Sequence, residues 1–104
     1  MRILANILKE SEQYYRDIKL KLERQIIALP KGSVKERKIS GYKYYYHQYR
    51  DGEKIVHKYL GKEKPAELLG QIDRRRSLQN ELKKVKEALK IIKRSKGRKR
   101  DQTR

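Results

Sequence analysis

The sequence contains no cysteine, no phenylalanine and no tryptophan, and it has a single methionine. Without cysteine, neither a disulfide framework nor a thiolate metal site can form, which is compatible with a reducing cytosol. Hydrophobic residues make up 36% of the chain and charged residues 41%, so there is material for only a thin core. We therefore expect the 104 residues to form one domain at most, with long helices supplying much of its core.

The sequence also lacks a long hydrophobic run. The apolar residues near its start, Ile3, Leu4, Ile7 and Leu8, are interrupted by polar residues at helical spacing. Such a stretch is neither a signal peptide nor long enough to span a bilayer. We expect a soluble, cytoplasmic protein that does not bind membranes.

Catalytic side chains are scarce as well. An enzyme needs a nucleophile, a base and an electrophilic stabiliser near one another. The sequence offers two histidines, no glycine-rich phosphate loop, and no carboxylate cluster in its basic centre beyond Asp51 and Glu53 at the turn. His47 and His57 fall on opposite faces of the hairpin described below, so they are not expected to share a metal. We predict a protein that is not an enzyme, with no metal site and no cofactor.

Positive charge is what the sequence has in excess. Lys and Arg number 30 against 13 Asp and Glu, a net charge of +17, and a polyanionic partner would relieve this self-repulsion. The segment from residue 31 to 64 is strongly basic and also holds most of the aromatic residues. Aromatic rings stack on unpaired bases while Lys and Arg contact phosphates. This combination favours binding of nucleic acid and does not separate RNA from DNA.

The chain is organised around residues 41 to 62, which hold six of its eight tyrosines. Asp51-Gly52 separates two strand-like runs and predicts a β-hairpin with a type I′ turn. A further strand from Val34 to Ile39 is expected to join this hairpin through Ser40-Gly41. The predicted unit is a three-stranded antiparallel β-meander over residues 34–62.

The two faces of this meander differ in character. With a two-residue loop at Asp51-Gly52, the opposed pairs are Arg50 with Glu53, Tyr49 with Lys54, His47 with Val56, Tyr45 with Lys58, and Lys43 with Leu60. One surface, the mixed face, then interleaves aromatic and basic residues and is the predicted nucleic-acid site: Lys43, Tyr45, His47, Tyr49, Lys54 and Lys58. The other, the tyrosine face, has Lys35 and Arg37 towards its edge and is expected to pack on the helices: Ile39, Tyr42, Tyr44, Tyr46, Ile55 and Tyr59. A slip of one residue would exchange the two sets.

Long helices are predicted on both sides of the meander. In the first, residues 2–29, a stripe of three-four spacing runs through Leu4, Leu8, Ser11, Tyr15, Ile18, Leu22 and Ile26 before Pro30 ends the helix. In the second, residues 65–92, a coiled-coil seam follows Leu78, Leu82, Val85, Leu89 and Ile92. The predicted fold is α+β, a single domain over residues 1–92 in which the two helices pack antiparallel. Two chains could also form a dimer through this seam.

Two further basic segments are candidates for phosphate contacts. Arg74, Arg75 and Arg76 interrupt the seam and could project from the helix as a patch. The predicted tail, residues 93–104, contains no apolar residue and is expected to be disordered in isolation. Its candidate contacts are Lys93, Arg94, Lys96, Arg98, Lys99 and Arg100.

Several short strings also carry a resemblance: Leu29-Pro30-Lys31-Gly32-Ser33, Tyr44-Tyr45-Tyr46, Gln48-Tyr49-Arg50, Gly52, Lys54 and Lys58-Tyr59-Leu60-Gly61-Lys62. Over roughly residues 29 to 90 the chain resembles a family of short basic proteins of unknown function from bacteria, archaea, their phages and mobile elements. The hairpin is similar to one near the start of some insertion-sequence transposases, whose catalytic domain this chain lacks. The resemblance implies a mobile-element setting and no settled activity.

These features predict a non-catalytic accessory protein of a phage or mobile element that binds RNA or DNA. The alternative is a protein-binding inhibitor, anti-CRISPR-like or antitoxin-like, that acts on a nucleoprotein effector and competes for its nucleic-acid contacts. A third reading is that the tyrosines are only the core of a small protein and that its charge is unspecific.

Overall fold

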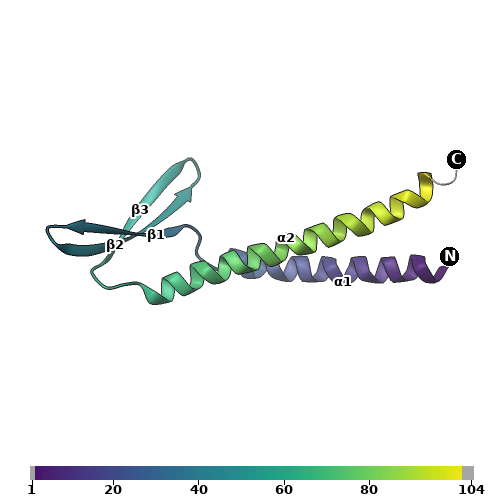
Figure 1. Ribbon diagram of the computed structural model, residues 1–104, viewed down its shortest axis with the longest axis horizontal. Coiled ribbons are helices and arrows are strands. Elements are labelled where there is room, and N and C mark those ends of the chain that lie inside the picture. The colour runs from purple at the N-terminus through teal and green to yellow at the C-terminus, as the bar shows by residue number, and fades with distance from the viewer. Residues whose placement is uncertain (1, 102–104) are drawn as a thin grey trace. The chain divides into compact units, whose positions relative to one another are not determined.

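The structure is a computed structural model that describes the backbone of residues 2–101 and the side chains of residues 2–96. Along the chain it contains α1 (Arg2–Ile27), β1 (Ser33–Ile39), β2 (Tyr42–Asp51), β3 (Lys54–Gly61) and α2 (Ala66–Asp101) (Figure 1). The predicted α+β fold, helix, meander and helix, is confirmed. The chain divides into two compact units. The helical unit joins α1 to the part of α2 from Leu78 on, and the sheet unit spans Ala28–Ser77.

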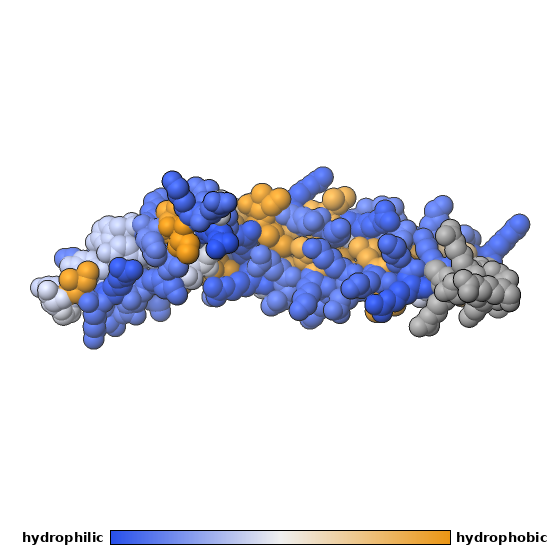
Figure 2. Space-filling view, turned by 90° about the horizontal axis from the view of Figure 1, so that it is seen from above, coloured by the Kyte–Doolittle hydropathy of each residue, from blue (hydrophilic) through white to orange (hydrophobic). Residues whose placement is uncertain are grey.

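The core of the helical unit is the predicted seam. Within this unit α1 and α2 run antiparallel (Figure 1). Leu22 and Ile26 on α1 and Leu78 and Ile92 on α2 are buried, and the other predicted residues of the two stripes are half-buried except Leu4, which is exposed. Two helices alone cannot enclose such a stripe, and Figure 2 shows apolar side chains still uncovered between the charged ones along the helices. In the part of the chain that the structure describes, no helix has an apolar stretch that could cross a membrane.

Both helices end at other residues than predicted. The first ends at Ile27 rather than residue 29, because Pro30 restricts the residue before it and the chain leaves the helix ahead of that point. The second continues past Ile92 to Asp101, so part of the predicted tail is helical. Lys and Arg are good helix formers, and no proline follows Ile92 to stop the helix.

The sheet has the order β1-β2-β3 with antiparallel pairing throughout. Ile39 lies opposite Tyr42, so Ser40 and Gly41 form the first turn, as predicted. Their φ angles of 53° and 82° are the two positive values that a type I′ turn requires.

The second turn is one position further along than predicted. Asp51 pairs with Lys54, which makes Gly52 and Glu53 the central residues. Only Gly52, with φ 63°, is in the left-handed region, the pattern of a type II′ turn rather than type I′.

This turn gives β2 and β3 a different register from the predicted one. Tyr46 lies opposite Tyr59 and Tyr49 opposite Val56. Such aromatic and aromatic–β-branched pairs stabilise a sheet better than the expected pairing of Tyr49 with Lys54. Relative to the prediction, each β2 residue pairs with a β3 residue two positions further along. A shift of two preserves the alternation, so the two faces keep their predicted members.

Several residues of the tyrosine face are exposed. Tyr42 is 60% exposed, Tyr59 54%, Ile39 51% and Ile55 53%, which contradicts the prediction that this surface is covered. The physical reason lies on the opposite side of the sheet, where the loop at Lys31-Gly32 crosses the mixed face. His47 Nε2 donates a hydrogen bond of 2.7 Å to the Lys31 carbonyl oxygen there.

Gly32 makes this crossing possible. Its φ is 99°, and a Cβ placed on it would lie 2.2 Å from the Gln48 carbonyl oxygen and 2.8 Å from Tyr49 Cβ. Only glycine allows the loop backbone to approach β2 so closely. The loop therefore covers one end of the mixed face and leaves the tyrosine face open.

Candidate nucleic-acid interface

Three tyrosine rings form a cluster on the tyrosine face. Tyr59 on β3 lies between two residues of β2, with ring centres 5.5 Å from Tyr46 and 6.2 Å from Tyr44. The rings are tilted by 60° and 44°, within the range of favourable aromatic pairs. Tyr42 extends the row along β2 and is as exposed as Tyr59. The result is an aromatic surface that other parts of the sheet unit leave accessible.

Two cationic side chains lie over these rings. The guanidinium carbon of Arg37 is 5.3 Å from the centre of the Tyr46 ring. The Lys62 ammonium is 5.2 Å from the Tyr42 ring centre and 6.0 Å from that of Tyr44. All three distances are within the reach of a cation–π interaction. Positive charge and aromatic surface are therefore in direct contact on this face.

The two faces differ in their acidic residues. Within the described strands, the register gives the tyrosine face no Asp or Glu, while Lys35, Arg37 and Arg50 stand on it. The mixed face carries Glu36 and Asp51. An approaching polyanion therefore meets positive charge without acidic neighbours on the described strand positions of the tyrosine face, whereas the mixed face also carries negative charge.

The structure brings part of the predicted mixed-face site together and neutralises part of it. Lys43 Nζ is 3.2 Å from Glu36 Oε1. Lys54 lies opposite Asp51 instead of Tyr49, and Lys58 lies opposite His47 instead of Tyr45. Lys54 and Lys58 are exposed, as the sequence prediction of phosphate contacts requires.

In the described strands the mixed face has no exposed aromatic ring, whereas on the tyrosine face Tyr42 and Tyr59 are exposed and the other two tyrosines are half-buried. Tyr45, His47 and Tyr49 are half-buried. The rings of His47 and Tyr49 pack on each other with centres 4.7 Å apart, and His47 is also tied to the crossing loop. These contacts give both rings a structural role.

Arg74, Arg75 and Arg76 do not form one patch. Consecutive helical residues point in different directions. Arg74 is exposed, and Arg76 donates a hydrogen bond of 3.4 Å to the Gly32 carbonyl oxygen. Arg75 is half-buried, and its Nε is buried without a partner among the described residues. Arg74 is therefore the one arginine of the three that is exposed, as the prediction assumed, and that makes no side-chain hydrogen bond or ion pair among the described residues.

The basic residues at the end of α2 also differ from one another in their surroundings. Arg94 is exposed, Lys93 lines a groove, and Lys96 contacts Glu12. Arg98, Lys99 and Arg100 lie outside the described side chains.

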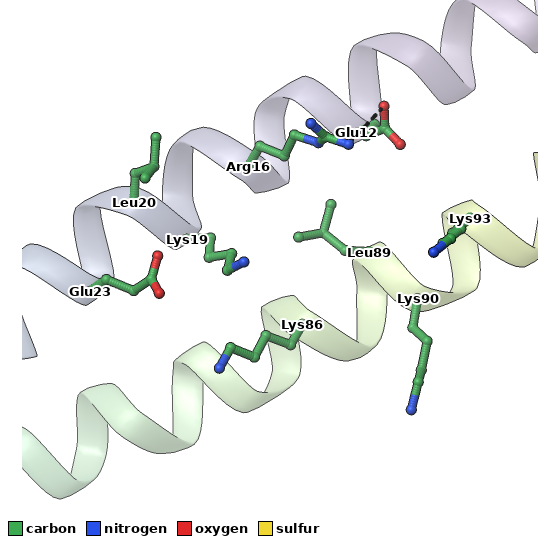
Figure 3. Close-up of a pocket in the computed structure, with 9 residues that line it drawn as sticks. All are labelled: Glu12, Arg16, Lys19, Leu20, Glu23, Lys86, Leu89, Lys90 and Lys93. Atoms are coloured by element: carbon green, nitrogen blue, oxygen red, sulfur yellow. Dashed lines mark ion pairs between the residues drawn. The ribbon is translucent and has the colours of Figure 1, made fainter.

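A groove of about 630 Å³ runs between α1 and α2 in the helical unit (Figure 3). Leu20 and Leu89 supply its apolar lining, and the other lining residues are charged: Glu12, Arg16, Lys19, Glu23, Lys86, Lys90 and Lys93. The two acids oppose binding of a polyanion here, so the groove is a weaker candidate than the tyrosine face.

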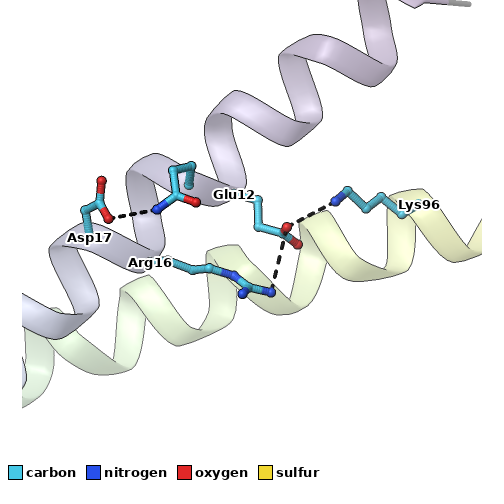
Figure 4. A network of polar contacts seen from close by, with 5 residues as sticks. Glu12, Arg16, Asp17 and Lys96 are labelled. Atoms are coloured by element: carbon cyan, nitrogen blue, oxygen red, sulfur yellow. Dashed lines mark hydrogen bonds and ion pairs between the residues drawn. The ribbon is translucent and has the colours of Figure 1, made fainter.

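Glu12 is the centre of a polar network beside this groove (Figure 4). Its Oε1 accepts a hydrogen bond of 3.1 Å from Lys96 Nζ and lies 3.7 Å from an Arg16 nitrogen. The hydrogen bond from Lys96, aided by both positive charges, holds the pKa of Glu12 below its ordinary value of 4.5 against a smaller opposing effect of desolvation. The network links the two helices and leaves Glu12 ionised at neutral pH.

The histidines fall on opposite faces in the observed register, His47 on the mixed face and His57 on the tyrosine face. Among the residues described, no group of three or more His, Cys, Asp or Glu side chains is placed to hold a metal ion.

The family model of a domain of unknown function (DUF6788) matches residues 8–70. The chain belongs to this family. The match begins and ends earlier than the resemblance expected over residues 29 to 90, and it includes the whole sheet. Neither the curated proteins nor the solved structures gave a match. The tyrosine face therefore lies wholly inside the segment that defines the family, whereas Arg74–Arg76 and the end of α2 lie outside it.

Sequence reasoning grouped the tyrosine face correctly but assigned it to the core. The alternation of β2 was the signal that placed Tyr42, Tyr44 and Tyr46 together. Nothing in the alternation indicated Lys62, because its position over the rings depends on an irregularity in β3. Arg37 was placed at the edge of the tyrosine face, and its position above Tyr46 follows from the register of β1.

Proposed function

We propose that this protein is a non-catalytic nucleic-acid-binding accessory protein that contacts bases with the tyrosine face and phosphates with the surrounding Lys and Arg. The observation that carries the proposal is the tyrosine cluster, in which Tyr59 is exposed beside the exposed Tyr42, with Arg37 and Lys62 in contact with its rings and no acidic residue on the described strand positions of that face. Aromatic stacking contributes ~1–3 kcal/mol per base, and each phosphate contact adds counterion release. A net charge of +17 would draw the protein to any nucleic acid at low salt.

The mobile-element setting comes from the resemblance of the hairpin and supports this role. An accessory protein that coats or delivers a strand requires no catalytic residue. The basic residues of the mixed face and of α2 would then strengthen binding electrostatically, without distinguishing one sequence from another.

The test is a titration of purified protein, freed of co-purified nucleic acid, with labelled single-stranded DNA and RNA over a range of salt concentrations. We expect log K to fall linearly with log salt at roughly −0.7 per phosphate contacted. Inorganic polyphosphate is the matched control, because it offers the charge without bases. If polyphosphate competes as well as an oligonucleotide of equal charge, the tyrosines do not contact bases and the proposal is wrong.

A second candidate is the protein-binding inhibitor, which one observation favours. Ile3 is 75% exposed at the start of α1, and its neighbours Leu4 and Ile7 are also exposed, although all three are apolar. Apolar residues in such a row are suited to docking against another protein. An inhibitor would need its partner effector to associate with nucleic acid, whereas the accessory protein binds alone, so the same titration separates the two candidates.

A further inference from the structure

The edge strand β3 contains a β-bulge. Tyr46 lies opposite Tyr59, yet the preceding residue, Tyr45, lies opposite Gly61. Leu60 is therefore the extra residue on β3, without a partner of its own on β2. An extra residue of this kind resets the alternation, so the residues after it point to the opposite face from the one they would otherwise occupy.

The bulge changes the face on which Lys62 lies. Continued without it, the pairing of Tyr46 with Tyr59 would bring Lys62 opposite Lys43, on the mixed face. With it, the residue after Gly61 falls beside Tyr44 instead, and the Lys62 ammonium lies over the rings of Tyr42 and Tyr44. Gly61 has a φ of 115°, a conformation that residues with a side chain rarely adopt.

Arg37 approaches the same cluster from the other edge of the sheet. It stands on β1, where it lies opposite Tyr44, and its guanidinium is placed over Tyr46. In the order β1-β2-β3, Arg37 stands on one edge strand and Lys62 directly follows the other. The tyrosine rings lie between these two cations.

We propose that a single strand of nucleic acid crosses this face from β1 to β3, with its bases on the tyrosine rings and its phosphates held by Arg37 and Lys62. This inference rests on the proposed function and names its ligand as an unpaired strand. Rings can stack on bases only where the base faces are free, which a double helix does not offer. A stacked base is worth more than an exposed cation–π contact, so a base takes the ring face and the cation moves to the adjoining phosphate.

The test compares three variants in the salt titration with a single-stranded oligonucleotide. Lys62→Ala should make the slope of log K against log salt shallower by about 0.7, the value of one phosphate contact on a single strand. Deletion of Leu60 should keep the wild-type slope, because the shortened strand pairs without a bulge and still places Lys62 opposite Tyr44. Lys21→Ala, which removes an exposed positive charge from α1, should keep the wild-type slope.

Circular dichroism shows whether the deletion variant folds, and Lys62→Ala carries the test alone if it does not. A wild-type slope for Lys62→Ala would overturn the inference, as would equal affinity of the wild-type protein for a duplex and for a single strand of the same sequence. If the wild-type protein binds no nucleic acid, the proposed function itself fails. Binding that is unaffected by Lys62→Ala removes only this arrangement of the strand.

Discussion

Lys96 donates a hydrogen bond of 3.1 Å to Glu12, which joins residues of α1 and α2 that are 84 positions apart in the sequence (Figure 4). Because this bond favours the ionised carboxylate, the pKa of Glu12 in the folded protein lies below its ordinary value of 4.5. A group of this kind stabilises the fold above its unfolded pKa, and the stabilisation is lost as the pH falls through the folded pKa.

We predict that Lys96→Ala raises the pKa of Glu12 towards 4.5. A residual lowering should remain, since the Arg16 guanidinium still lies nearby. NMR titration of the Glu12 carboxyl carbon measures this directly. Lys90→Ala is the matched control, because Lys90 lines the same groove but points away from α1 (Figure 3), and it should change the pKa less. Equal shifts in the two variants would show that only general charge acts on Glu12.

The seam of the helical unit predicts a contrast between two leucines of α1. Leu22 is 6% exposed and Leu20 is 53% exposed. Leu22→Ala should lower the free energy of unfolding by ~2–5 kcal/mol, because it removes buried surface and leaves a cavity. Leu20→Ala should change it by less than about 0.5 kcal/mol, as is usual for surface positions. Urea unfolding of both variants tests the seam, and similar midpoints would remove it as the core of this unit.

Gly32 predicts a second effect on stability. Gly32→Ala would place a Cβ against the Gln48 carbonyl oxygen in addition to straining the backbone. Gly41→Ala also strains a positive φ, but its Cβ would meet nothing within 4 Å. We expect the Gly32 variant to be less stable than the Gly41 variant by about 1–3 kcal/mol in urea unfolding. Equal stability would mean that the loop does not cross the mixed face this closely.

An exposed tyrosine of the tyrosine face should contribute to binding without contributing to the core. Tyr42→Ala should weaken single-strand binding roughly 5- to 150-fold, the equivalent of ~1–3 kcal/mol, and leave the salt slope unchanged. Tyr14 is the matched control, since it is a tyrosine of α1 with 62% exposure, close to the 60% of Tyr42. Tyr14→Ala should bind as the wild type does. Fluorescence anisotropy measures both, and equal losses would point to a contribution that does not depend on the face.

The helices and the faces of the sheet could be predicted because they depend on periodicity. The spacing of Leu22 and Ile26 on α1, and of Leu78 and Ile92 on α2, places each pair on the apolar stripe of its helix wherever that helix ends. The members of each face were also predicted correctly, although the position of the second turn was wrong. A shift of the β2–β3 pairing by two positions leaves every residue on its own side, whereas a shift by one would have exchanged the faces.

The open side of the sheet could not be predicted, because it depends on a contact distant in the sequence. The Lys31-Gly32 loop is held over part of the mixed face by its hydrogen bond with His47. No local sequence pattern predicts that bond. The position of Lys62 depends in turn on the extra residue Leu60, which reads in the sequence as an ordinary strand residue. The larger apolar content of the tyrosine face argued for burial, yet the two exposed tyrosines of the sheet, Tyr42 and Tyr59, lie on it.

The most direct test of the account is to map the tyrosine rings by NMR while a single-stranded oligonucleotide is added to the full-length protein. Ring current shifts report which rings stack on bases. The account predicts large shifts for Tyr42, Tyr44, Tyr46 and Tyr59 and small ones for Tyr45 and Tyr49. Shifts confined to Tyr45 and Tyr49 would place the bases on the mixed face and contradict it.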